Sequence, residues 1–165
     1  MLVLRDVLVP VDFESTSIHA LAYARDLART FGATLHVLHV LEDAFALAAG
    51  TEGSLSAFPR LEREAEDDAR RRLQDLLTDA DRKAGAMTAV RLGTSPASSI
   101  VAYATEIQAD VIVMGTHGRR GTSIGTIGSV AEQVVRTAKC PVLTVREKPV
   151  ERVRQRVSEA AAATA

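Results

Sequence analysis

Several features that are common in proteins are scarce in this chain of 165 residues. Tryptophan is absent and aromatic residues make up only 4%, so the core has to be built from Val, Leu, Ile and Ala. The single cysteine, Cys140, excludes an internal disulfide. Neither sign of charge dominates, because 20 basic residues stand against 21 acidic ones. This balance argues against recruitment by nucleic acid or by an anionic membrane.

Long apolar runs are missing as well. Arg5 and Asp6 interrupt the apolar N-terminal stretch, which is too short for a signal peptide. No run approaches the ~18 apolar residues that a membrane span requires. We therefore expect a cytoplasmic protein without a membrane segment. A single domain is predicted over residues 1–146, followed by a polar and then Ala-rich tail over residues 147–165.

The chain does contain a regular alternation of apolar strand patterns and amphipathic helix patterns. Ser15 or Thr16 is expected to cap the first helix, and Gly32 to end it. Residues 42–58 are interpreted as an irregular excursion that Pro59 closes. The strands are predicted near residues 3–10, 33–41, 87–92, 109–115 and 140–146, and the helices near residues 15–31, 60–84, 96–107 and 129–138.

The predicted helix over residues 60–84 carries many charges on its outer face. Acidic residues precede arginines by four positions, which is the favourable order for ion pairs on a helix. We therefore expect a solvated helix face that is laced by such pairs. The expected pairs are Glu66–Arg70, Asp67–Arg71 and Asp68–Arg72.

Strands that alternate with helices predict a parallel sheet with helices on both faces. Two orders are common for five strands, a flavodoxin-like order and the Rossmann-like order 3-2-1-4-5. The candidate ligand residues decide between them. Pro10, Val11 and Asp12 follow the first strand, and the residues from Gly115 onward follow the fourth. This placement favours a Rossmann-like three-layer sandwich of order 3-2-1-4-5, with the site at the carboxyl ends of these two strands.

A glycine-rich loop joins the fourth strand to the last helix. Five of the ten glycines lie between Gly115 and Gly128, both included. Glycine lets a backbone approach a ligand closely, and a helix that begins at Ser129 points N–H groups into the loop. Hydroxyl side chains and the guanidinium groups of Arg119 and Arg120 add donors for phosphate. We interpret the loop as a phosphate site, and the alternative is a glycine-rich surface loop without a ligand.

Spacing excludes two familiar phosphate motifs. The loop contains no lysine, so it is not a Walker A motif, and it does not follow the dinucleotide pattern G-x-G-x-x-G. Two residues separate Gly115 from Gly118, and nine separate Gly118 from Gly128-Ser129. This spacing resembles the ATP-binding subgroup of the universal stress protein family, whose motif is G-x2-G-x9-G-(S/T). The flanking stretches V-L-V-P-V-D-F, L-H-V and C-P-V-L-T-V also resemble that family, over about residues 2–146.

The resemblance implies a ligand and a site. Proteins of this subgroup bind ATP, usually with Mg²⁺ or Mn²⁺. Adenosine would meet the ends of the first two strands, the glycine loop would hold the phosphates, and Asp12 would lie near the ribose or a phosphate-bound metal ion. The implied nucleotide-binding residues are Pro10, Val11, Asp12, Val40, Met114, Gly115, His117, Gly118, Arg119, Gly128, Ser129 and Val130.

The last predicted strand is a candidate interface. In the order 3-2-1-4-5 it lies at an edge of the sheet, and an apolar edge without a lysine invites pairing. The resemblance implies the same arrangement, because the family forms homodimers through this strand. We therefore expect a homodimer through Pro141–Arg146.

Other reactive side chains are interpreted as structural. His36 and His39 lie three apart on a strand, so they point to opposite faces and cannot bind one metal ion. Cys140 precedes Pro141 at the start of a strand and is expected to be a buried, inert thiol. Asp12 has an alternative role as a cap of the first helix.

The motif therefore predicts an ATP-binding, stress-response type of regulatory protein. One alternative is a slow metal-dependent ATPase, in which Asp12 holds the metal and His117 or Arg119 stabilises developing charge. The absence of a Walker lysine and of an evident general base speaks against this enzyme. The other alternative is a module that binds a protein partner without any nucleotide.

Overall fold

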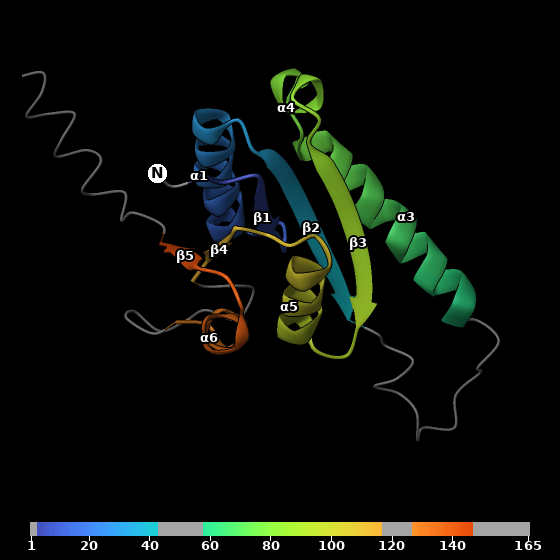
Figure 1. Ribbon diagram of the computed structural model, residues 1–165. Coiled ribbons are helices and arrows are strands. Elements are labelled where there is room, and N and C mark those ends of the chain that lie inside the picture. Colours follow the sequence, from blue (N-terminus) through green and yellow to red (C-terminus); the bar gives the residue numbers. More distant parts are fainter. Residues whose placement is uncertain (1–2, 43–57, 117–126, 147–165) are drawn as a thin grey trace, which may run out of the picture.

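The computed structural model describes residues 3–42, 58–116 and 127–146. Most of the predicted excursion, most of the glycine loop and the predicted tail lie outside these residues. The described residues form a five-stranded parallel sheet of order β3-β2-β1-β4-β5 (Figure 1). The predicted Rossmann-like order is confirmed.

The elements follow the predicted alternation closely. The strands are β1 (Asp6–Pro10), β2 (Thr34–Glu42), β3 (Met87–Gly93), β4 (Val111–Gly115) and β5 (Val142–Val145). The helices are α1 (Ser15–Phe31), α3 (Phe58–Leu76), α4 (Asp79–Lys83), α5 (Pro96–Glu106) and α6 (Ser129–Thr137).

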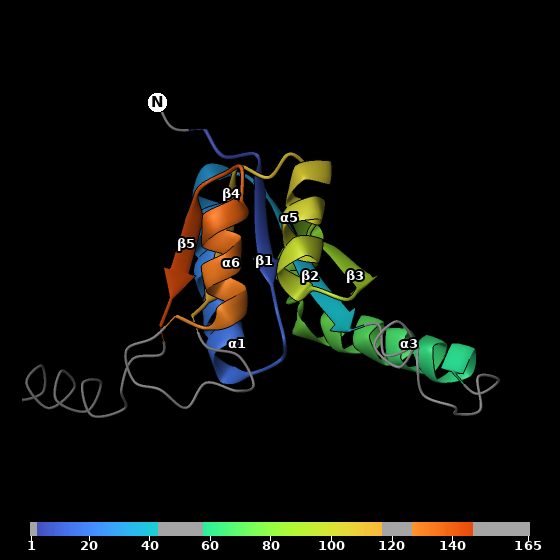
Figure 2. The same cartoon turned by 90° about the horizontal axis from the view of Figure 1, so that it is seen from below.

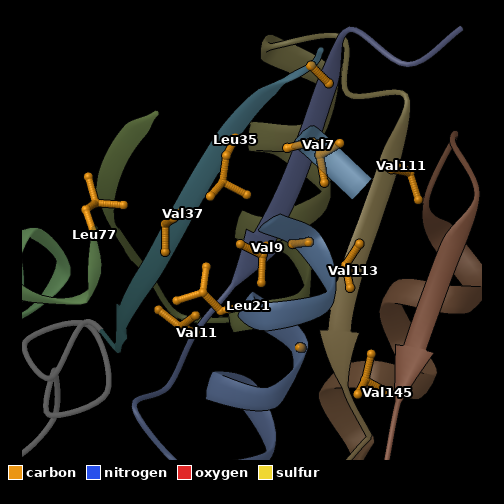
Figure 3. Close-up of a cluster of buried hydrophobic side chains, with 14 of the residues drawn as sticks. Val7, Val9, Val11, Leu21, Leu35, Val37, Leu77, Val111, Val113 and Val145 are labelled. Carbon is orange, nitrogen blue, oxygen red and sulfur yellow. The ribbon is translucent and has the colours of Figure 1, made fainter. Parts of the chain in front are cut away.

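Helices cover both faces of the sheet, as a three-layer sandwich requires. α1 and α3 pack on one face, where Val7, Val9 and Leu21 are fully buried (Figure 3). α5 and α6 lie side by side on the other face, over Leu8 and Ile112 (Figure 2). Successive residues of a strand point to opposite faces, so β1 contributes side chains to the cores on both faces of the sheet. Its sequence is therefore a continuous apolar run.

The pairing of β1 with its two neighbours is unequal. β1 pairs with β2 along its whole length, up to Pro10 opposite Leu38. Its pairing with β4 stops earlier, at Leu8 opposite Ile112. Proline has no N–H to donate, so Pro10 cannot extend the ladder toward β4. At their carboxyl ends β1 and β4 are therefore not paired with each other.

The single helix predicted over residues 60–84 is wrong, because α3 ends at Leu76 and α4 begins at Asp79. Thr78 separates them with a capping box: its side chain accepts the N–H of Asp81, whose carboxylate accepts the N–H of Thr78. Arg25 of α1 holds this junction, since its guanidinium bonds the Leu76 carbonyl and lies 2.7 Å from the Asp81 carboxylate. Local polar bonds thus interrupt an apolar stripe that continues in the sequence.

Burial at the α3–α4 junction acts to raise the pKa of Asp81. The backbone N–H of Thr78 and the Arg25 guanidinium outweigh burial and hold this pKa below its ordinary value. Asp81 is therefore ionised at neutral pH and supports the break between the two helices.

The predicted caps of α1 also need correction. The N-cap is Glu14, and no side chain caps the helix within the described residues. Ser15 and Thr16 already lie inside the helix, and the Thr16 side chain is buried against β4. Gly32 ends α1 as predicted, in the left-handed conformation with φ 66°.

One of the three predicted ion pairs on α3 forms, between Arg70 and Glu66 at 3.1 Å. Arg71 pairs instead with Asp68, three residues away at 3.5 Å. Arg72 does not pair with Asp68, because its guanidinium stacks on the ring of Phe13 in the turn between β1 and α1. Within the described residues, no helix has the length and apolarity needed to cross a membrane.

Candidate functional site

The candidate site lies at the carboxyl edge of the sheet, where three neighbouring strands end. Pro10 ends β1, Gly115 ends β4, and Val40 lies near the end of β2, half-buried on the α5 side. Met114 is buried on that same side. The strand order thus brings together predicted site residues that are far apart in the sequence.

The backbone that leaves β1 is held by β2. The N–H of Val11 donates to the carbonyl of Leu38 over 2.8 Å. Nδ1 of His39 lies 2.7 Å from the carbonyl oxygen of Val11, and a carbonyl only accepts, so this nitrogen carries the hydrogen. β2, rather than β4, therefore fixes the exit of β1.

Asp12 closes a local turn with its half-buried side chain. Its Oδ1 accepts the N–H of Glu14 over 3.1 Å, and its own N–H donates to Oγ of Ser17 over 3.3 Å. The Ser17 hydroxyl in turn donates to the Glu14 carbonyl over 2.9 Å. Glu14 is the N-cap, so the alternative role of Asp12 as the helix cap is wrong. The turn occupies one carboxylate oxygen, and a carboxylate has two.

Phe13 has an unusual backbone conformation, with φ 68°. A bulky residue in the left-handed region costs ~1–3 kcal/mol and persists only where its surroundings hold it. The Arg72 guanidinium lies 3.8 Å from the Phe13 ring centroid, and the His39 ring centroid lies 4.5 Å from it. Neither Phe13 nor Arg72 was predicted as a site residue, because their contact joins residues far apart in the sequence.

Gly115 lies directly against the first turn of α1. A Cβ at this position would lie 2.9 Å from Cγ2 of Thr16 and 3.1 Å from its backbone carbonyl group. The approach to Cγ2 is closer than real Cβ atoms come and the approach to the backbone is tight, so the packing of α1 on β4 favours glycine here. The first glycine of the motif is explained by the fold.

Gly128 is different, because its backbone conformation does not require glycine. It is the N-cap of α6 with φ −62°, a value open to any residue, and no side chain caps this helix within the described residues. Its N–H donates to the carbonyl of Thr116, whose own N–H donates to Val145 of β5 over 3.0 Å. These bonds place the start of α6 beside the end of β4.

α6 begins at Ser129, as predicted, and its positive end therefore faces the loop. Ser129 is exposed and Val130 is half-buried. The predicted phosphate residues His117, Gly118 and Arg119 lie outside the described residues. The structure thus describes both ends of the predicted loop, and residues 117–126 between them are known from the sequence alone.

The described residues contain no group of three or more His, Cys, Asp or Glu side chains that could hold a metal ion. His36 lies 2.9 Å from the Asp6 carboxylate and contacts Tyr103 of α5, whereas His39 contacts Phe13 on the other face. The two histidines cannot share a metal ion, in agreement with the prediction.

Cys140 is half-buried, not buried as predicted, and it packs against the apolar cluster beneath α5 and α6. Burial raises the pKa of its thiol, so the thiol is protonated at neutral pH. A protonated thiol is a poor nucleophile, which agrees with the predicted inert role.

Comparison with known proteins identifies the family. Residues 4–146 match the model of the universal stress protein family. The chain belongs to this family. Universal stress protein MJ0531 of Methanocaldococcus jannaschii is 30% identical over 143 residues, which cover 87% of this chain and 82% of the relative.

Two solved structures share the fold of this universal stress protein. Hypothetical protein MJ0577 is similar with a TM-score of 0.75 at 23% identity, over 90% of this chain and 99% of that one. A universal stress protein from Archaeoglobus fulgidus, solved in complex with dAMP, has a TM-score of 0.51 at 26% identity, over 88% and 99% of the two chains. The likeness therefore extends over most of each chain.

Proposed function

We propose that this chain is a cytoplasmic, ATP-binding regulatory protein that holds the nucleotide over the carboxyl ends of β1 and β4. The observation that carries the proposal is the complete motif Gly115, Gly118, Gly128-Ser129, whose first and last positions lie at a strand end and at a helix start. Ligands of open α/β sheets bind where neighbouring strands part, and β1 and β4 part here. The dAMP complex of a family member supports an adenine nucleotide as the ligand.

The start of α6 suits the phosphates. Its first N–H groups have no side-chain cap within the described residues, and the helix dipole favours an anion at this end. Glycine at position 128 is not required by the backbone, so we attribute it to the close approach of a phosphate. His117, Gly118 and Arg119 would complete the cradle, with Ser129 and Val130 at the helix start.

The start of α1 suits the other end of the nucleotide. Val11 and Asp12 are held in place by β2 and by the turn, and Val40 lies on the neighbouring strand. Asp12 is a single carboxylate, which cannot hold a metal ion alone. Mg²⁺ or Mn²⁺ bound to phosphates commonly needs only one or two protein carboxylates, so Asp12 fits a metal ion that arrives with the nucleotide.

Isothermal titration calorimetry of the purified chain tests the proposal. ATP with Mg²⁺ is expected to bind with one site per chain, and the double variant Gly118→Val, Gly128→Val is expected to lose binding while it stays folded by circular dichroism. Arg71→Met is the matched control, because Arg71 lies on an exposed helix face and pairs there with Asp68. Absence of heat at millimolar ATP in the wild-type chain contradicts the proposal.

The same samples test the alternative enzyme. Phosphate release is expected to be negligible over hours while ATP stays bound. Turnover that disappears in Asp12→Asn, with ATP binding preserved, would instead identify a metal-dependent ATPase.

We also propose a homodimer through β5. This strand is an edge of the sheet, and Leu143 on it is 41% exposed. Leu143→Lys is expected to give a monomer in light scattering after gel filtration, because a lysine on an edge strand opposes pairing. Met87→Lys is the control, since Met87 is 53% exposed on β3, the opposite edge, and this variant should remain a dimer.

A further inference from the structure

The turn between β1 and α1 contains a strained aromatic residue next to the candidate site. Among the described residues, Phe13 and Gln108 are the non-glycine positions with positive φ. Gln108 follows the end of α5, where the left-handed conformation is common. Phe13 lies before a helix and directly after Asp12, so helix termination does not explain its conformation.

Two other elements clamp the Phe13 ring. Arg72 of α3 places its guanidinium carbon 3.8 Å from the ring centroid, which is a cation–π contact. His39 of β2 places its ring centroid 4.5 Å away at an interplanar angle of 43°. The ring therefore ties the turn to α3 and to β2 at once.

The same clamp reaches the residues proposed to meet the nucleotide. His39 also bonds the carbonyl of Val11 over 2.7 Å, and it precedes Val40 on β2. Asp12 lies between Val11 and Phe13, so the backbone torsions of Phe13 set the path of the turn that Asp12 closes. Loss of the clamp would let Phe13 return to an ordinary φ, and Asp12 would move with it.

We propose that Phe13 is a positioning residue for the nucleotide and that Arg72 acts through it. The ring, held between Arg72 and His39, keeps Val11 and Asp12 in the conformation that binds ATP with Mg²⁺. Nucleotide affinity thereby depends on α3, because Arg72 of that helix holds the ring that positions Val11 and Asp12. This inference rests on the proposed function.

Substitutions at Phe13 separate positioning from stability. Phe13→Ala removes the ring and still disfavours the left-handed φ of this turn, so both stability and affinity should fall. Phe13→Gly removes ring and strain, so stability should recover relative to alanine while affinity for ATP with Mg²⁺ stays about tenfold below wild type, because glycine does not hold one conformation. Phe13→Tyr keeps the ring and should bind as the wild type does. Affinity that follows stability across the series overturns the inference.

Substitutions at Arg72 test the connection to α3. Arg72→Met should weaken binding of ATP with Mg²⁺ about threefold to fivefold, the size expected for loss of one cation–π contact. Arg72→Lys keeps a cation and should recover part of this loss. Arg71→Met removes the neighbouring guanidinium, which pairs with Asp68, and should leave affinity unchanged. Equal affinity for Arg72→Met and Arg71→Met overturns the inference.

A measurement without nucleotide separates this inference from the proposed function. Hydrogen exchange should show about tenfold lower protection of the Val11 amide in Phe13→Gly and Arg72→Met, with the Val37 amide of β2 unchanged, because only the turn is released. Unchanged protection of Val11 overturns the positioning role whether or not ATP binds. Failure of the wild-type chain to bind ATP, with Val11 released as expected, overturns the proposed ligand and the nucleotide part of this inference.

Discussion

β1 and β4 are joined firmly at one end and part at the other. At their amino ends, the Asp110 carboxylate accepts the N–H groups of Arg5 and Asp6 over 2.7 and 3.0 Å, and the N–H of Asp110 donates to the Asp6 carbonyl over 2.9 Å. At their carboxyl ends the ladder has already stopped, and the N–H of Val11 bonds β2 instead. The difference separates the end where the two strands are held together from the end where the candidate site lies.

Each end of the strand pair has an aspartate, and the two aspartates form different hydrogen bonds. The carboxylate of Asp110 satisfies two backbone donors, and these bonds hold its pKa below the ordinary value. Asp12 uses one carboxylate oxygen for a local turn beside the site. Substitutions at the amino end should therefore change stability without affinity, and most substitutions at the carboxyl end should do the reverse.

Gly115 is the expected exception at the carboxyl end, with the largest effect. Gly115→Val places a branched side chain against the backbone of Thr16, so α1 or β4 has to shift. Overpacking of this kind should lower the free energy of unfolding by about 3 kcal/mol. Urea denaturation measures this value, and a loss below about 0.5 kcal/mol would show that the two elements separate easily.

Gly128→Ser should have the opposite profile. Serine is a good N-cap and suits φ −62° and ψ 151°, so α6 should be stabilised by a few tenths of a kcal/mol. Its hydroxymethyl group would stand where we place a phosphate, and affinity for ATP should fall about tenfold, or about 1.4 kcal/mol. Calorimetric titration measures the affinity and urea denaturation measures the stability of the same sample. Unchanged affinity would show that Gly128 has no role in binding.

Asp110→Asn tests the joined end. A neutral amide replaces a carboxylate that accepts two N–H groups, and we expect a loss of about 1 kcal/mol because the group is partly exposed. The pKa of Asp110 is lowered on folding, so its contribution is complete above the ordinary carboxyl pKa of about 4 and is lost as pH falls through the lower folded value.

Urea denaturation of the wild-type chain and Asp110→Asn from pH 7 to pH 2 therefore checks the joined end. The stability difference between the two proteins should shrink toward acid pH. A difference that stays constant with pH would assign the effect to packing instead.

Asp12→Asn should have the smallest effect and the most specific one. The amide oxygen can still accept the N–H of Glu14, so the turn and the stability should be preserved. Affinity for ATP should fall about threefold with Mg²⁺ present and should not change with EDTA, because only the metal contact is lost. An equal loss in both conditions would place Asp12 on the ribose.

The sequence predicted the parts of the molecule that depend on local pattern. Apolar runs located the strands, and the glycine spacing located the loop between β4 and α6. The strand order also followed, because Pro10 to Asp12 and Gly115 had to meet at one edge. The break at Thr78 was missed because the apolar stripe continues through it, although the capping box that begins α4 lies within four residues of the sequence.

Two glycines of one motif looked alike in the sequence, and only the tertiary structure separates them. Local pattern alone predicted that the candidate site lies at the ends of β1 and β4, because hydrophobic periodicity and turn residues depend on a few neighbours. Three contacts join residues distant in the sequence: Gly115 packs on Thr16, the Asp110 carboxylate accepts the N–H of Arg5, and Arg72 stacks on Phe13. Such contacts depend on how helices and strands pack, so no short stretch of sequence contains them.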